Sequence, residues 1–307
     1  MQTLRICLEY YVPWTNDIGY QLAIERGWYR EVGIDLRQVL PDPFLGDTLE
    51  HVTRGEADFG VFPPNRLFVR HEAGQPLLAI AAINQRAMET ILTLAGNGIE
   101  RPRELTGRRV ALNPTPRGIA MVRHLIAADG GNPDDIELID SGPREVNAED
   151  LKDGLADAFF GAYWAWDALF GNVTEEERVA WPIDEIGAPP YHSYLLGTRA
   201  AFADEEPELI TAFLAATERG FRAAAADPEL ALAVARQAIP YVRPELIARS
   251  LSVLPGSWFH AGEWGRNRNE LHEPYAAWLV EHGILSDPNV WTRATTNAFL
   301  PPTGSIS

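Results

Sequence analysis

Residues 4–40, LRICLEYYVPWTNDIGYQLAIERGWYREVGIDLRQVL, decide the fold. The apolar segment at residues 4–10 predicts a strand, the spacing from Ile18 to Glu31 predicts a helix that closes at Gly33, and residues 34–40 predict a second strand. A strand, a helix and a strand in so short a segment form a βαβ unit, whose crossover favours parallel pairing. We therefore expect an α/β protein with a mostly parallel sheet.

The same alternation continues along the chain in two rounds. Short strands and helices alternate over residues 48–94, and a second round starts at residue 108 and runs to residue 160. Each round contains a segment that follows a helix and leads into an apolar strand, Gly55-Glu56-Ala57-Asp58-Phe59-Gly60 and Gly154-Leu155-Ala156-Asp157-Ala158-Phe159. Two similar α/β lobes are therefore expected, and the almost entirely helical spacing of residues 205–285 predicts helices that cover one of them.

Charge and composition exclude several classes of protein. The 307 residues include 26 Lys and Arg against 43 Asp and Glu, and the net charge of −17 would repel a phosphate backbone, so nucleic acid is not expected as a partner. The single cysteine, Cys7, cannot form an intramolecular disulfide, and the seven histidines show no paired ligand spacing. We expect neither a metal site nor a cofactor.

The sequence also bears on localisation. Apolar runs stop well short of the roughly 20 residues that cross a bilayer, so we expect no transmembrane segment. The first residues carry neither the basic segment nor the apolar core of a signal peptide. The protein is expected to be extracytoplasmic if a signal was removed from this chain, and cytoplasmic otherwise.

The loop between the first strand and the first helix is the leading candidate for ligand contacts. Ligands of open α/β sheets bind at the carboxyl ends of strands, where this loop lies. Aromatic rings can stack on a flat heteroaromatic ligand, and small polar groups can orient it. The candidates in this loop are Tyr11, Trp14, Asn16 and Asp17. The alternative is an aromatic satellite core in which Asn16 or Asp17 is a helix N-cap.

Further candidates follow strands of the second round. Thr115 lies between a strand and a helix, where its hydroxyl and the helix start favour an anion. Tyr163, Trp164 and Trp166 cannot all point into one core, so at least one is expected to line a cleft. His192 begins the strand that leads out of the second lobe, although a surface or capping histidine is the alternative. We assign no catalytic residue, because the sequence contains neither a nucleophile elbow nor a phosphate-binding glycine loop.

Several of these segments, taken in order, resemble one known family. They are Trp14-Thr15-Asn16-Asp17-Ile18-Gly19-Tyr20, Gly27-Trp28-Tyr29, Gly55-Glu56-Ala57-Asp58-Phe59-Gly60, Gly161-Ala162-Tyr163-Trp164 and Trp278-Leu279-Val280-Glu281-His282-Gly283. The chain resembles the thiamine-pyrimidine-precursor family, which comprises periplasmic-type substrate-binding proteins of ABC transporters and a related intracellular pyrimidine synthase. The resemblance covers nearly the whole chain.

The resemblance implies a type II periplasmic-binding-protein fold with a ligand cleft between two lobes. It places residues 1–88 and 196–307 in the first lobe and residues 89–195 in the second, with crossovers near residues 84–90 and 193–197. It implies that Trp14, Asn16 and Trp164 contact the ligand.

The chain also departs from the family pattern. Asp17 stands where the family often has a histidine, and Asn65 and Thr115 stand where the synthase uses a histidine and a phosphate loop. The cysteine-rich iron-binding stretch of the synthase is replaced by Ala188-Pro189-Pro190-Tyr191-His192-Ser193. Asn65 and Thr115 remain candidate ligand contacts, and an acidic partner for an aminopyrimidine must be Asp17, Asp167 or another residue. The synthase chemistry is not expected.

Two functions follow as expectations. The first is a substrate-binding protein that closes around a small aromatic nitrogen heterocycle, such as a thiamine pyrimidine precursor, and delivers it to an ABC transporter permease. The alternative is an intracellular enzyme on the same fold that acts on a small aromatic or heterocyclic metabolite.

Overall fold

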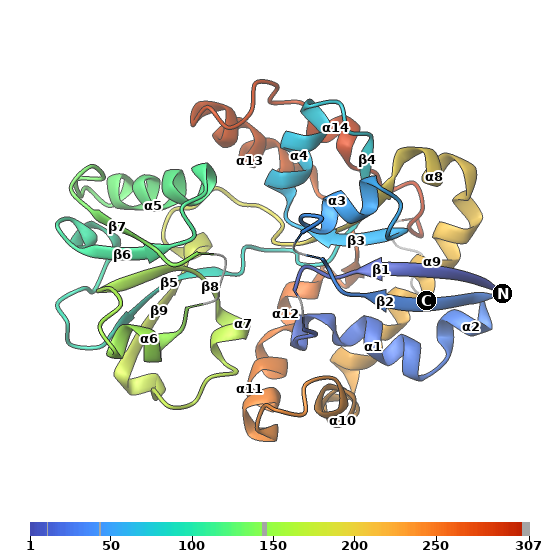
Figure 1. Ribbon diagram of the computed structural model, residues 1–307, viewed down its shortest axis with the longest axis horizontal. Helices are drawn as coiled ribbons and strands as arrows, with labels where there is room; N and C mark the ends of the chain where they lie inside the picture. The colour runs from blue at the N-terminus through green and yellow to red at the C-terminus, as the bar shows by residue number, and fades with distance from the viewer. Residues whose placement is uncertain (11, 43, 143–145, 303–307) are drawn as a thin grey trace.

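Two five-stranded sheets, one in each lobe, carry the fold (Figure 1). The computed structural model describes residues 1–10, 12–42, 44–142 and 146–302. In the first lobe the strands lie in the order β2 (Ile34–Val39), β1 (Gln2–Cys7), β3 (Phe59–Phe62), β10 (Leu195–Arg199) and β4 (Leu77–Ala82). In the second lobe the order is β7 (Glu137–Asp140), β6 (Arg109–Leu112), β8 (Ala158–Tyr163), β5 (Glu89–Leu94) and β9 (Arg178–Pro182).

Strand directions follow from how the chain enters each lobe. β1 pairs in parallel with β2 and β3, and β6 pairs in parallel with β7 and β8, as the βαβ pattern predicts. β5 and β10 are the first strands after each passage between the lobes, and they run antiparallel to both neighbours. The predicted α/β class is confirmed, and each sheet is mixed where the chain crosses over.

Helices cover both faces of the first sheet (Figure 1). One side carries α1 (Ile18–Glu25), α2 (Trp28–Glu31), α9 (Pro207–Ala226) and α10 (Pro228–Ala238), and the other carries α3 (Thr48–Thr53), α4 (Pro64–Glu72), α13 (Asn269–Glu281) and α14 (Trp291–Ala294). The remaining helices of this lobe are η1 (Thr15–Asp17), α8 (Ala200–Glu205), α11 (Pro244–Val253) and α12 (Pro255–Trp258). The second lobe has η2 (Pro102–Leu105), α5 (Pro116–Ala128), α6 (Ala148–Lys152), α7 (Trp164–Asp167), η3 (Glu175–Glu177) and η4 (Ile183–Glu185). Among the described helices, none is both long enough and apolar enough to span a bilayer.

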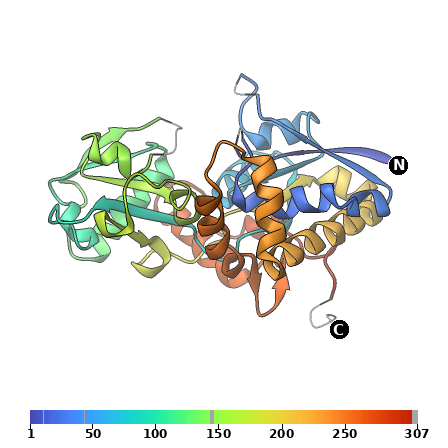
Figure 2. The same cartoon turned by 90° about the horizontal axis from the view of Figure 1, so that it is seen from below.

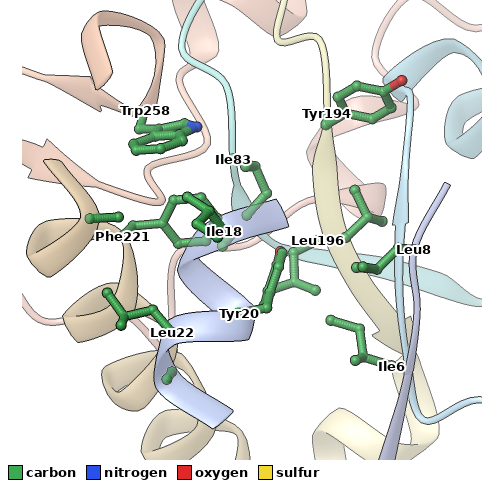
Figure 3. Close-up of a cluster of buried hydrophobic side chains, with 14 of the residues drawn as sticks. Ile6, Leu8, Ile18, Tyr20, Leu22, Ile83, Tyr194, Leu196, Phe221 and Trp258 are labelled. Atoms are coloured by element: carbon green, nitrogen blue, oxygen red, sulfur yellow. The ribbon is translucent and has the colours of Figure 1, made fainter. Parts of the chain in front are cut away.

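The core of the first lobe reflects the alternation of side chains along β1. Ile6 and Leu8 pack toward α1 and α9, whereas Cys7 packs into the layer of α4 and α13 on the opposite face. Figure 3 shows Ile6 and Leu8 near Leu196 of β10, with residues of α1 between this sheet and Phe221 of α9. A strand buried on both faces explains why residues 4–8 are nearly continuously apolar.

Two connections join the lobes, which lie side by side along the long axis of the molecule (Figure 2). Residues 83–88 lead from β4 to β5, and residues 186–194 lead from η4 to β10. The expected second crossover at residues 193–197 is wrong in its later part, because Leu195, Leu196 and Gly197 already pair with β3 and β4. The division of the chain into lobes at residues 88 and 195 stays a prediction, although Leu195 belongs to the first sheet.

Three other expectations need correction. The helix expected over residues 18–31 is two helices, because Gly27 adopts the left-handed conformation with φ 74° between α1 and α2. Strand β9 lies in a segment that was not predicted as regular structure. The helical region at residues 205–285 is interrupted by a short hairpin of β11 (Phe259–His260) and β12 (Glu263–Trp264).

An aromatic cluster between the lobes as the candidate binding site

Five aromatic side chains from both lobes meet between the two sheets. We call them the aromatic cluster: Tyr10, Trp14, Tyr163, Trp166 and Tyr194. Tyr10 stacks on Trp166 with ring centroids 5.5 Å apart, and Trp14 stacks on Tyr163 at 5.9 Å. The Tyr194 hydroxyl donates to the Tyr10 hydroxyl at 3.2 Å. Each stacked pair therefore joins one ring of the first lobe to one ring of the second.

The positions of these rings follow from the ends of strands. Tyr10 and Trp14 lie in the loop between β1 and η1, Tyr163 ends β8, and Trp166 lies in the α7 turn that follows. Tyr194 is the last residue before β10. The carboxyl ends of β1 and β8 thus face each other, which is where ligands bind in sheets of this type. Any movement of one lobe against the other changes the spacing of these rings.

A mostly buried carboxylate, Glu9, lies beside the cluster, near enough to act on the Tyr194 hydroxyl. Its Oε1 accepts a hydrogen bond of 2.8 Å from Arg66, in the first turn of α4, while Oε2 is buried and lacks a hydrogen-bond partner among the described residues. Burial raises the pKa of Glu9 to about 7, against the opposing effect of Arg66. The shift favours the protonated form of Glu9 relative to an ordinary surface carboxyl, and in its ionised form Oε2 can accept a hydrogen bond.

Asn16 and Asp17 are buried and bonded within the protein. The Asn16 amide exchanges hydrogen bonds of 2.9 and 3.1 Å with Asn84 of the first crossover, and its oxygen accepts from the Trp258 indole at 2.8 Å. Asp17 accepts from the Trp14 backbone N–H at 3.2 Å, which fixes the loop that carries the Trp14 ring. Burial raises the pKa of Asp17 to about 7. Their contribution seen here is to position Trp14, and direct contact with a ligand stays a prediction.

Trp164 lies apart from the stacked rings. Its backbone N–H donates to the Met88 carbonyl at 3.1 Å, and its indole N–H reaches the Ala87 carbonyl at 3.5 Å, so Trp164 packs against the first crossover. The rings that face Trp14 from the second lobe are Tyr163 and Trp166. A ligand contact by Trp164 stays a prediction.

His192 links the two crossovers. Its Nδ1 donates to the Asn84 carbonyl at 3.0 Å, and its Nε2 accepts from the Arg268 backbone N–H at 3.1 Å. Complete burial lowers the pKa of His192 to about 3, which keeps the ring neutral and agrees with this pairing. His192 is therefore neither a surface nor a capping residue, and it lies in the connection between lobes.

The remaining candidates are dispersed. Thr115 is exposed and caps α5 by accepting from the Gly118 N–H at 3.1 Å, so its hydroxyl oxygen already has a local partner. The neighbouring Arg117 is buried and paired with Glu89 at 2.6 Å. Asn65 is half-buried at the start of α4. Tyr11 lies outside the described residues.

Sequence reasoning missed four residues beside this site, Glu9, Tyr10, Arg66 and Tyr194. Glu9 is the first acidic residue of the chain, and it stands just beyond the first strand, a position that could have identified it. Arg66 and Tyr194 gave no comparable signal, because each reaches the site from a distant part of the sequence. A group of three or more His, Cys, Asp or Glu side chains that could hold a metal does not occur within the described residues.

A separate hollow of about 530 Å³ lies on the outer face of the first lobe and includes no residue of the aromatic cluster. Trp28, Arg219 and Arg222 contribute to its lining. The Arg219 guanidinium already stacks on the Trp28 ring at 4.2 Å from the centroid. We therefore assign the candidate site to the aromatic cluster, where both lobes contribute.

Two α/β lobes with aromatic rings meeting between them form an architecture that periplasmic binding proteins share. A model of the family described as "NMT1/THI5 like" matches residues 14–231, more than two thirds of the chain. The chain belongs to this family, and the family expected from the residues is confirmed. The formylaminopyrimidine-binding protein of Halalkalibacterium halodurans is 25% identical over 298 residues, which cover 94% of this chain and 88% of that protein.

Solved structures agree on the fold. The periplasmic aliphatic sulphonate binding protein SsuA of Escherichia coli is similar with a TM-score of 0.75 and 14% identity, over 96% of this chain and 92% of that chain. The alkanesulfonate-binding protein SsuA of Xanthomonas axonopodis pv. citri gives a TM-score of 0.73 and 15% identity, over 96% of this chain and 98% of that chain. The predicted two-lobed periplasmic-binding-protein fold is therefore confirmed.

Proposed function

We propose that this protein binds a small aromatic nitrogen heterocycle between its lobes and delivers it to an ABC transporter permease. The observation that carries the proposal is the aromatic cluster, in which both lobes supply rings at the carboxyl ends of their strands. Flat heterocycles bind well between such rings, because stacking adds to the burial of apolar area. The curated relative is named for a formylaminopyrimidine, which is a ligand of this chemical class.

The spacing of the rings indicates how such a ligand binds. A flat ring between two others needs their planes about 7 Å apart, twice the van der Waals contact of about 3.5 Å. The centroids of Trp14 and Tyr163 are 5.9 Å apart. The planes lie no farther apart than the centroids, so insertion moves the two rings apart by at least about 1 Å, with the rest of the interface held by contacts outside the cluster.

Delivery to a permease fixes where the protein acts. In an importer of this kind the membrane spans belong to the permease, and the binding protein meets it at the outer side of the membrane. The proposal therefore places this chain outside the cytoplasm. A shift in the sedimentation of the purified chain with its candidate permease in detergent, seen only with ligand, would test that step directly.

The binding step is tested by calorimetric titration with a formylaminopyrimidine and with hydroxymethylpyrimidine. Trp14→Ala removes a stacking ring and its buried area, so we expect roughly tenfold weaker binding or more. Trp28→Ala, in the hollow on the outer face, is the matched control and should bind like the parent. If Trp14→Ala melts at a lower temperature yet binds like the parent, the ring belongs to the core alone and the proposed site is wrong.

Catalysis on the same fold predicts a different result. Mass spectrometry of the small molecule recovered after incubation should return the probe unaltered if the protein only binds it. Conversion of the probe that scales with protein concentration would support the enzyme alternative instead.

A further inference from the structure

Two histidines from different lobes face each other where α5 meets α13. His124 lies on α5 of the second lobe and His282 caps the end of α13 of the first (Figure 1), and their ring centroids are 5.9 Å apart. The Trp278 ring of α13 contacts both, at 5.8 Å from His124 and 4.4 Å from His282. Two titratable rings thus meet across a contact between the lobes.

The second crossover fixes the orientation of His124. The His124 Nε2 donates to the Gly187 carbonyl at 3.0 Å, so Nδ1 is the nitrogen that takes up a proton when the neutral ring becomes charged. Nearby on η4, the Glu185 carboxylate is paired with Arg86 at 2.9 Å. The partner ring, His282, is exposed and therefore exchanges protons with the solvent.

The charges around this pair set the sign of its response to acid. Burial lowers the pKa of His282, the neighbouring Glu281 carboxylate opposes this, and the positive charge of His124 lowers the pKa of His282 further. Arg123, next to His124 on α5, is exposed and carries a positive charge that does not change in acid. Two protonated rings at this spacing therefore repel each other across the contact, and Glu281 offsets only part of that repulsion.

The rest of the α5–α13 contact is held by other bonds. Tyr275 of α13 accepts from Arg117 of α5 at 3.0 Å, and Arg117 is paired with Glu89 at 2.6 Å. All of these groups are mostly buried, and breaking the bond would separate a buried charge from a partner. The effect of the histidines is therefore expected at the end of α13 that carries His282.

We propose that His124 and His282 form an acid-sensitive contact between the lobes. While at least one of the two rings is neutral, α5 and the end of α13 stay together as they do here. When both rings are protonated, their repulsion moves the two helices apart and shifts the molecule away from this arrangement of lobes. Imidazole is the side chain whose charge ordinarily changes between about pH 5 and about pH 8. The inference goes beyond the proposed function, because it holds for the chain without ligand.

The spacing of the two helices can be measured directly by electron–electron resonance between nitroxide labels. Ala127→Cys on α5 and Ala277→Cys on α13 place the labels at exposed positions, whereas the native Cys7 is buried and does not react. From about pH 8 to about pH 5, the ratio of longer to shorter distances should rise roughly two- to fivefold, the range expected for one exposed charge pair. His282→Gln in the labelled chain should abolish this rise. His282→Glu should reverse it, because a carboxylate attracts protonated His124 across the contact.

A matched control separates this response from other effects of acid. His71→Gln removes a histidine of α4 whose Nδ1 donates to the Leu77 carbonyl of the same lobe at 3.1 Å, so the response of the parent should persist. His124→Gln is a second variant that keeps a donor for the Gly187 carbonyl, and it should abolish the rise even if His282→Gln does not fold. Distances that do not change with pH in the parent, or an equal rise in parent, His124→Gln and His282→Gln, would overturn the inference. The measurement uses the chain without ligand, so its failure leaves the proposed function intact.

Discussion

At the scale of single residues, burial decides what the polar groups around the cluster do. Asn16 is held by Asn84 and by Trp258, so a loop of the first lobe, the first crossover and the C-terminal third share one hydrogen-bond network. Asp17 has its pKa raised to about 7 by burial and accepts the Trp14 N–H. These groups stabilise the position of the Trp14 ring, and they make the stability of that position depend on pH.

The pH dependence of Asp17 has a definite sign. Its carboxyl has an ordinary pKa of 3.8 and a folded value of about 7, so between these values the folded state holds more protons than the unfolded state. The contribution of Asp17 to the stability of the fold is complete below pH 3.8, and it is lost as the pH rises through about 7. Asp17→Asn keeps an acceptor for the Trp14 N–H and removes the charge. We expect the variant to melt higher than the parent by at least about 2 °C at about pH 8, and close to the parent at about pH 4.

Calorimetric melts across this pH range check the prediction. Burial of His192 has the opposite effect, because it lowers the pKa of that ring from 6.5 to about 3. The contribution of His192 to the stability of the fold is therefore lost as the pH falls from about 6.5 to about 3. The difference between variant and parent cancels this effect. Asp287→Asn is the control, since hydrogen bonding to Arg293 lowers the pKa of that partly exposed carboxyl and the substitution brings no gain at high pH. A parallel pH profile for Asp17→Asn and parent would contradict the assignment.

Sequence patterns predicted some residues of this site, and there is a physical reason why they did not predict the others. Trp14, Tyr163 and Trp166 were predictable, because aromatic residues directly after strands lie where ligands bind. The pairing of Glu9 with Arg66 depends on a contact across 57 positions, which local pattern does not encode. The same holds for Tyr194, whose ring meets the cluster only because β10 returns the chain to the first sheet.

At the scale of elements, the close crossing of α1 and α9 shapes the first lobe. Gly19 of α1 and Gly220 of α9 face each other, and a methyl group on Gly220 would lie 2.0 Å from the Gly19 carbonyl oxygen. Around this contact, Tyr20 packs edge-on against Phe221 at 5.3 Å. Helical spacing predicted α9, with Pro207 in its first turn, and the structure confirms it. β9 was not predicted, because buried and exposed residues do not alternate regularly along it.

Replacement of this glycine should be costly. Gly220→Ala forces α1 and α9 apart, and we expect a loss of about 1–3 kcal/mol or more in the free energy of unfolding. Gly256→Ala is the matched control, because a methyl group there meets no atom within 4 Å. It should leave stability unchanged or raise it by about 0.4–1 kcal/mol. Urea unfolding of both variants measures the difference, and equal stability of Gly220→Ala and parent would show that the helices can move apart freely.

At the scale of the whole molecule, contacts outside the aromatic cluster also hold the lobes together. Arg249 of α11 donates to the carbonyls of Ala168, at 2.9 Å, and Phe170, at the end of α7 in the second lobe. Ser250 donates to the Ala165 carbonyl at 2.5 Å. On the other side, Tyr275 of α13 accepts from Arg117 of α5 at 3.0 Å. The arrangement of lobes seen here is thus stabilised by the protein itself as well as by any ligand.

Loss of the α11–α7 contact should therefore shift the balance between closed and open arrangements. Arg249→Ala removes two hydrogen bonds across the lobes, and each contributes about 0.5–1.5 kcal/mol. The free protein should then show a larger radius of gyration in small-angle scattering, and saturating ligand should restore the compact form. The dissociation constant should rise by the factor by which the closed population falls.

Arg236→Ala provides the control for this shift, because Arg236 is exposed on α10, where loss of the side chain leaves the contacts between lobes in place. It should match the parent in scattering and in affinity. If Arg249→Ala binds more weakly without any change in radius, the effect is local to α7 and the closure argument is wrong. A larger radius with unchanged affinity would also contradict the closure argument, because a ligand held by both lobes must bind less tightly when fewer molecules are closed.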